Sequence, residues 1–108
     1  MASLLIQGAT EVKPGEMKKF NVAGTDILIS NMSGTYYAIA NTCTHMGGSL
    51  ADGHLEGGVV KCPKHGAQYD VKTGKCVGEL SFFFVKKLTD DVKAYPVEIK
   101  DGQVYIEI

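Results

Sequence analysis

Hydrophobic and polar residues alternate along much of the chain, which is the pattern of β-strands that bury one face. Alternating residues at 20–22 lead into the apolar run 27–29, and a further run at 36–39 follows the turn-like sequence 31–34. Runs of this length, separated by polar and glycine-containing connections, predict short antiparallel strands joined by tight turns.

The clearest hairpin is predicted at the C-terminal end. Apolar residues alternate at 97–99 and again at 104–108, and the pair Asp101-Gly102 stands between them. An Asp-Gly pair tolerates the positive φ angles of a type I′ turn. Residues 10–15 predict a turn with one helical loop, since Pro14-Gly15 stops anything longer.

The amino-acid composition of the chain changes between residues 41 and 78. Eight of the thirteen glycines lie in this stretch, together with all three cysteines and all three histidines. We expect long loops carried on a β scaffold, interrupted by strands at 59–61 and 68–71. Loops of this length in so short a chain are usually functional.

Length and composition narrow the class of protein. A chain of 108 residues, 44% hydrophobic and 21% charged, predicts one globular domain over residues 1–108. The net charge is −1 and every basic residue is lysine, so nothing predicts nucleic-acid binding. No apolar run is long enough to span a membrane, and the first residues do not resemble a secretory signal. An odd number of cysteines argues against a disulfide framework, so we expect a cytoplasmic protein.

Two short motifs within the glycine-rich stretch contain candidate metal-binding residues. Cys43 and His45 form a C-x-H box, and after sixteen residues Cys62 and His65 form a C-x-x-H box. Two thiolates and two imidazoles suit a tetrahedral zinc ion. However, zinc fingers commonly pair Cys with Cys and His with His. One Cys and one His in each box also suits a two-metal cluster, and the neighbouring glycines would let backbone N–H groups approach bridging sulfides.

With these two boxes, the sequence resembles the Rieske-type [2Fe–2S] proteins, and the similarity covers most of the chain. The resemblance implies a small antiparallel β sandwich with two cluster-binding loops, at about 41–50 and 61–70, on one end. It implies one cluster per chain, in which Cys43 and Cys62 bind the inner iron and His45 and His65 bind the outer one. A set of two thiolates leaves the cluster less negative than four thiolates do, which raises its reduction potential.

Three positions distinguish the chain from the high-potential Rieske proteins of cytochrome bc complexes. Gly48 and Lys64 stand where those proteins have two cysteines joined in a disulfide, and Ala67 replaces a serine that hydrogen-bonds a bridging sulfide. Tyr69 matches a tyrosine that hydrogen-bonds a ligand cysteine. These differences remove stabilisation of the reduced cluster, so we expect a potential at the low end of the Rieske range, as in Rieske ferredoxins.

Several other residues have a plainer interpretation. His54 matches no ligand position and is expected in an exposed loop, and Cys76 is expected to be a small buried side chain. Residues 81–87, with three phenylalanines and two lysines, form an insertion that we interpret as core rather than as a docking patch. Ferredoxins that serve ring-hydroxylating dioxygenases are usually shorter here, which argues for a different acceptor.

The leading hypothesis is a soluble one-electron carrier that is not itself an enzyme. We expect a monomer that takes an electron from a reductase, a flavoprotein, and passes it to an oxygenase or another redox enzyme. No nucleophile–base pair or phosphate-binding loop is present in the sequence. Two alternatives remain open: a structural zinc module, and a small subunit or regulatory domain of a larger redox enzyme.

Overall fold

The computed structural model describes residues 3–42, 48–63, 67–78 and 91–107. Within these ranges the chain forms β-strands and two single turns of 3₁₀ helix, η1 (Ala9–Glu11) and η2 (Leu50–Asp52). In these ranges no helix is long and apolar enough to cross a membrane. The strands in chain order are β1 (Ser3–Leu5), β2 (Met17–Val22), β3 (Thr25–Met32), β4 (Thr35–Ala40), β5 (His54–Glu56), β6 (Val59–Lys61), β7 (Gln68–Asp70), β8 (Cys76–Gly78), β9 (Ala94–Tyr95), β10 (Val97–Lys100) and β11 (Gln103–Glu107).

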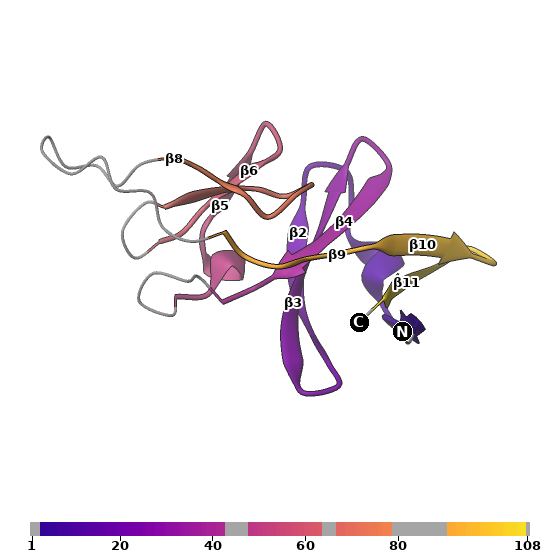
Figure 1. Ribbon diagram of the computed structural model, residues 1–108. Coiled ribbons are helices and arrows are strands. Elements are labelled where there is room, and N and C mark those ends of the chain that lie inside the picture. Colours follow the sequence, from indigo (N-terminus) through magenta and orange to yellow (C-terminus); the bar gives the residue numbers. More distant parts are fainter. Residues whose placement is uncertain (1–2, 43–47, 64–66, 79–90, 108) are drawn as a thin grey trace, which may run out of the picture.

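All the strand pairs of the described chain are antiparallel, and they form three sheets. The strand orders are β1-β11-β10, β2-β3-β4-β9 and β5-β6-β7-β8. Figure 1 shows the β2–β4 hairpins in the middle, with the β5–β8 sheet on one side and the β10–β11 hairpin on the other. The predicted all-β antiparallel sandwich is therefore confirmed, with its strands divided among three sheets.

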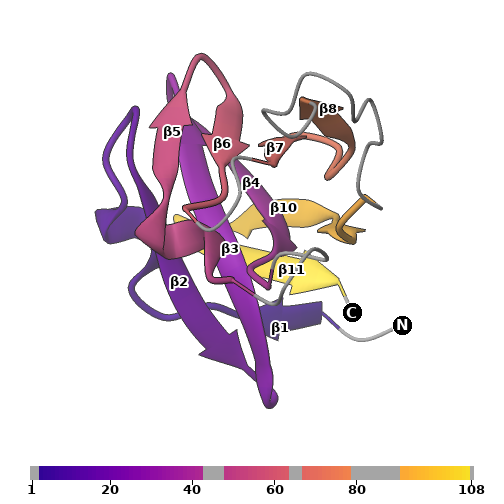
Figure 2. The same ribbon diagram turned by 90° about the vertical axis from the view of Figure 1, so that its left-hand side faces the viewer.

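The central strands β3 and β4 are buried on both faces. Leu28 and its register partner Ile39 face one hydrophobic core, whereas Ile27, Ile29 and Ala38 face another. We call the first the site core and the second the scaffold core. The run at 27–29 is continuously apolar because each of its faces is covered, and Figure 2 shows β3 running through the middle of the molecule.

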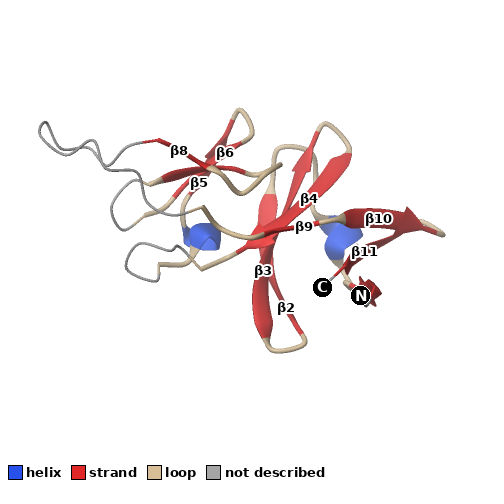
Figure 3. Ribbon diagram, in the orientation of Figure 1, coloured by secondary structure: helices blue, strands red, loops and turns tan. Residues whose placement is uncertain are grey.

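The two cores draw on different parts of the chain. The site core contains buried residues from β3 to β8 and from the segment before β9: Leu28, Ile39, Leu50, Val60, Cys62, Ala67, Tyr69, Val71, Cys76 and Val92. The scaffold core is built by the two ends of the described chain and the central hairpins: Ile6, Ala9, Val12, Val22, Ile27, Ile29, Ala38, Val104 and Ile106. Figure 3 shows η2 beside the β5–β8 sheet and η1 beside β10 and β11.

The predicted turn at Asp101-Gly102 is confirmed, whereas the turn predicted at 31–34 is narrower than expected, because Asn31 and Met32 belong to β3. Asp101 and Gly102, with φ of 50° and 75°, join β10 to β11, and Ser33 and Gly34, with φ of 56° and 94°, join β3 to β4. Positive φ at both central positions matches the right-handed twist of the flanking strands. The predicted helical loop near residue 10 is η1, which begins one residue earlier than expected.

Two expectations for the middle of the chain need correction. The segment around His54 is not a loop, because His54–Glu56 forms strand β5 and pairs with β6. The predicted strand at 68–71 ends at Asp70, and Val71 is a buried turn residue whose N–H donates to the Gly58 carbonyl oxygen at 3.0 Å. The strand predicted at 59–61 is confirmed as β6.

Candidate functional site

Cys62 is the predicted ligand that the structure describes. It follows β6 directly, and its side chain is 1% exposed within the site core. The Cys62 N–H donates a hydrogen bond of 2.7 Å to the carbonyl oxygen of Ala67. This bond brings together the two ends of the loop that contains His65. The thiol therefore starts from a fixed backbone position, at the junction of a strand and a loop.

The other three predicted ligands, Cys43, His45 and His65, lie outside the described residues, as do Lys64 and the insertion at 81–87. Within the described ranges, no group of three or more His, Cys, Asp or Glu side chains is placed to hold a metal ion. The structure consequently characterises the bases of the two ligand loops rather than the loops themselves.

The base of the first ligand loop is fixed in a similar way to that of the second. Thr42, which precedes Cys43, forms an antiparallel bridge with Ser49 on the far side of the loop. Asn41 is buried at the end of β4, and its carbonyl oxygen accepts a 2.9 Å hydrogen bond from the Leu50 N–H. Both predicted ligand loops thus begin and end at hydrogen-bonded pairs in the described chain.

The remaining predicted residues around the site have mixed outcomes. Tyr69 is fully buried on β7, and Ala67, immediately before β7, is 1% exposed. Both lie in the site core with Cys62. Cys76 is buried on β8, as predicted, and its N–H donates to Asp91 Oδ1 at 2.8 Å. Gly48, at one of the positions that carries a disulfide cysteine in bc-type proteins, is buried beside the bridge residue Ser49.

His54 lies beside the second loop without being a predicted ligand. Its side chain is 75% exposed, and Nε2 is 3.5 Å from Glu56 Oε2 on the same strand. Together with Asp52, Lys61 and Cys62 it lines a recess of about 320 Å³. The recess beside the second ligand loop is therefore lined by charged side chains of both signs, Asp52 and Lys61.

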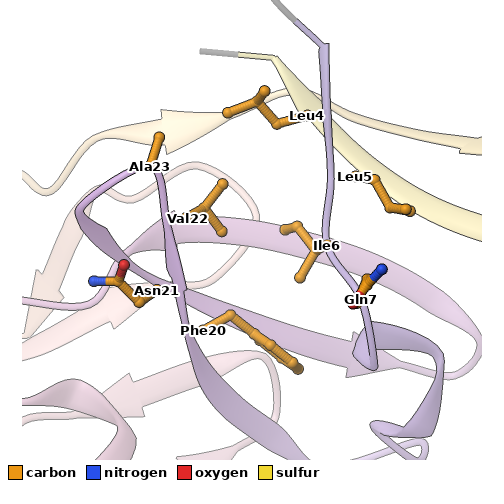
Figure 4. Close-up of a pocket in the computed structure, with 8 residues that line it drawn as sticks. All are labelled: Leu4, Leu5, Ile6, Gln7, Phe20, Asn21, Val22 and Ala23. Atoms are coloured by element: carbon orange, nitrogen blue, oxygen red, sulfur yellow. The ribbon is translucent and has the colours of Figure 1, made fainter.

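A larger hollow lies away from these loops. Its volume is about 510 Å³, and residues 4–7 and 20–23 line it. Figure 4 shows the side chains of Ile6 and Val22 between these two chain segments. None of its described lining residues is His, Cys, Asp or Glu, so it supplies none of the side chains that bind iron.

Sequence reasoning missed two residues near the loop bases, Asn41 and Gly53. The sequence does not distinguish Asn41 from the other asparagines, because its burial and its hydrogen-bond partners are known only from the fold. Nothing in the sequence distinguishes Gly53 from the other glycines around it, since its importance depends on its contact with Lys61 on the neighbouring strand β6.

Comparison with known proteins assigns this fold and motif set to a family. Residues 3–82 match the family profile of the Rieske [2Fe-2S] domain. The ferredoxin component of the naphthalene 1,2-dioxygenase/salicylate 5-hydroxylase systems of Ralstonia sp is 34% identical over 91% of this chain and 88% of that protein. The ferredoxin component of biphenyl 2,3-dioxygenase from Rhodococcus jostii (strain RHA1) is 39% identical over 85% of this chain and 91% of that protein.

A solved structure agrees with these sequence relatives. A chain from the complex of reduced oxygenase and oxidized ferredoxin in carbazole 1,9a-dioxygenase superimposes with a TM-score of 0.82. It is 30% identical, covering 96% of this chain and 91% of that one. The chain belongs to the Rieske [2Fe–2S] domain family. Within that family it is a ferredoxin: it holds one [2Fe–2S] cluster and carries electrons, and it is not itself a catalytic enzyme. The structural zinc module is thereby set aside.

Proposed function

We propose that Cys43, His45, Cys62 and His65 hold the cluster, with the two cysteines on one iron and the two histidines on the other. The observation that carries this assignment is the position of Cys62. Its side chain is buried in the site core, and its backbone closes the loop that contains His65. The donor set also fits, because two thiolates and two imidazoles are the ligands that define a Rieske centre.

The protein contributes rigidity and shielding at this site. When bound, the cluster supplies a one-electron redox couple. Burial of Cys62 would shield its thiolate from water, and the hydrogen bonds at the two loop bases fix the backbone at Cys62 and at Thr42. A potential at the low end of the Rieske range follows from Ala67, whose methyl group cannot donate a hydrogen bond.

The ligand assignment is tested by analysis of the purified protein and its variants. Anaerobic purification followed by iron and sulfide analysis should give two of each per chain. EPR should be silent in the oxidised protein and show a Rieske-type signal after reduction. A variant that lacks Cys62 and still holds a full cluster would refute the ligand set. Zinc without sulfide would overturn the assignment altogether.

We propose further that the electron acceptor is an oxygenase and that the donor is a reductase of the flavoprotein class. The relatives named as dioxygenase ferredoxin components support an oxygenase in spite of the insertion at 81–87. The test is stopped-flow mixing of the reduced protein with a purified oxygenase from the same genome. Rapid oxidation of the ferredoxin supports the proposal, and no oxidation faster than by buffer alone contradicts it.

The 108 residues are proposed to act as one domain, as a monomer in the cytoplasm. Pairing of β1 with β11 supports a single unit, because it joins the two ends of the described chain. Sedimentation of the holoprotein at several concentrations tests the oligomeric state. A mass above that of one chain would contradict the monomer, and consistent co-purification with a large subunit would favour a subunit of a larger enzyme.

A further inference from the structure

A five-residue segment, Ser49–Gly53, connects the bases of the two ligand loops. It contains η2 and follows the first loop directly. One end of the segment is held by Asn41, which precedes the first loop, and the other end rests against Lys61, which precedes Cys62. We call Ser49–Gly53 the brace.

Asn41 makes four hydrogen bonds, three of them to the brace and one to Asp26 on β3. Its side-chain Nδ2 donates to Ser49 Oγ at 2.9 Å, and its Oδ1 accepts from the Ala51 N–H at 2.9 Å. Its backbone carbonyl accepts from the Leu50 N–H, and its own N–H donates to the Asp26 carbonyl oxygen at 3.0 Å. A buried polar side chain with both ends satisfied specifies one arrangement of its partners, because any other leaves a buried group unpaired.

Gly53 sets the distance between the brace and the second loop. Its N–H donates to the Leu50 carbonyl oxygen at 2.9 Å, which closes η2. A Cβ atom at Gly53 would overlap the carbonyl oxygen of Lys61 and would lie 3.0 Å from its carbonyl carbon. The backbone there has φ of −91°, which other residues can adopt, so glycine is required for space rather than for conformation.

The contact at Lys61 directly affects the backbone position of Cys62, a proposed ligand. The carbonyl of Lys61 belongs to the peptide that links it to Cys62, so displacing that oxygen displaces the Cys62 backbone as well. The Cys62 N–H is itself committed to Ala67. The brace therefore touches the second loop at the peptide that carries its cysteine.

We propose that Asn41 and Gly53 are positioning residues that fix the separation of the two ligand loops and thereby tune the cluster. This inference rests on the proposed ligand set, since it requires that Cys43 and Cys62 both bind iron. Neither residue belongs to the two Cys–His boxes. Their effect on the cluster is exerted through the brace and through the backbone of Cys62.

The test compares Asn41→Ala and Gly53→Ala with Asn31→Ala in the full-length holoprotein. Asn31 is a matched control: it is also buried on the β3–β4 hairpin, its Nδ2 donates to the Val12 carbonyl oxygen at 2.8 Å, and its Oδ1 accepts from the Gly34 N–H at 2.8 Å. All three variants should lower the midpoint of urea unfolding. Three further readouts separate positioning from simple stability: the reduction potential, the EPR signal of the reduced protein, and the rate of iron loss to a chelator.

We expect Asn41→Ala and Gly53→Ala to shift the potential and alter the EPR signal, whereas Asn31→Ala leaves both unchanged. Residues that orient metal ligands typically contribute roughly 10- to 100-fold to metal affinity, so iron loss should accelerate by about tenfold or more in the two brace variants. If Asn41→Ala does not accumulate, Ser49→Ala removes the Asn41–Ser49 bond alone and should produce a smaller shift in the same direction.

Two results overturn the proposal in distinguishable ways. Brace variants that change the urea midpoint alone, with the potential and EPR signal of the unmodified protein, would show that the brace is structural only. A Cys62→Ala variant that keeps two irons would instead show that the ligand set is wrong, whatever the brace variants do.

Discussion

The backbone N–H of Cys62 donates to the carbonyl oxygen of Ala67 across 2.7 Å, and both side chains lie buried in the same core. The loop that contains His65 is thus closed at its base by Cys62, a proposed ligand, and by Ala67, which stands where the resemblance to bc-type Rieske proteins implies a serine. Because these two residues meet at one hydrogen bond, small substitutions at either position should have separable effects on assembly and on potential.

Cys62→Ala should abolish cluster assembly, because a methyl group cannot replace a thiolate ligand. Iron and sulfide analysis of the anaerobically purified variant should detect neither above background. Cys76→Ala is the matched control, since Cys76 is the other buried cysteine of the described chain and lies on β8 in the same core. The control should keep its full complement of iron and the EPR signal. Loss of the cluster from both variants would indicate a folding defect instead.

His65→Cys should lower the reduction potential of any cluster that assembles, and His45→Cys should do the same. Each substitution adds a negative thiolate, which disfavours the electron. Since two such replacements separate the Rieske range, from about −150 mV upward, from plant-type ferredoxins near −400 mV, one should cost on the order of 100 mV. Redox titration followed by visible spectroscopy measures the shift. A rise in potential, or none, would mean that these histidines are not ligands.

Ala67→Ser should raise the reduction potential, because a hydroxyl at this position adds a donor that stabilises the reduced cluster. Ala38→Ser provides the control: Ala38 is 2% exposed, close to the 1% of Ala67, but it lies in the scaffold core. Both serines should cost some stability, and only Ala67→Ser should move the potential in voltammetry. Equal potentials in the two variants would show that other groups set the value.

Leu28→Ala should destabilise the protein by roughly 2 to 5 kcal/mol, the usual range for a buried leucine whose removal leaves a cavity. Leu28 is fully buried against the site core. Leu5→Ala, at a leucine that is 38% exposed, should cost about 1 kcal/mol or less. Urea unfolding followed by circular dichroism compares the two. Equal losses would contradict the assignment of Leu28 to a tightly packed core.

The strands with the strongest patterns were predictable from the sequence, and the short ones were not. The hairpin at Asp101-Gly102 carries both alternation and a turn pair, so two independent signals agree. Strand β5 (His54–Glu56) has three residues, two of them charged or ionisable, between glycine-containing turns. Its strand conformation comes from pairing with β6, which is tertiary information.

The residues of the candidate site also differ in how far they could be predicted from the sequence. Cys62 and its box could be proposed as ligands from the sequence, because ligand chemistry restricts both residue type and spacing. Asn41 could not be ranked above other asparagines, because its partners Ser49 and Ala51 become visible only once the loop is closed. Gly53 depends on a contact with Lys61, which belongs to a different strand. Candidate ligands can therefore be proposed from the sequence, whereas the proposed positioning residues are found only in the fold.

Strands β3 and β4 divide the interior into two cores, and this division determines where loss of the cluster should be felt first. The scaffold core is assembled from segments that contain none of the four predicted ligands, whereas Cys62 belongs to the site core. Loss of the cluster should therefore disturb the packing around Cys62 before it disturbs the scaffold core.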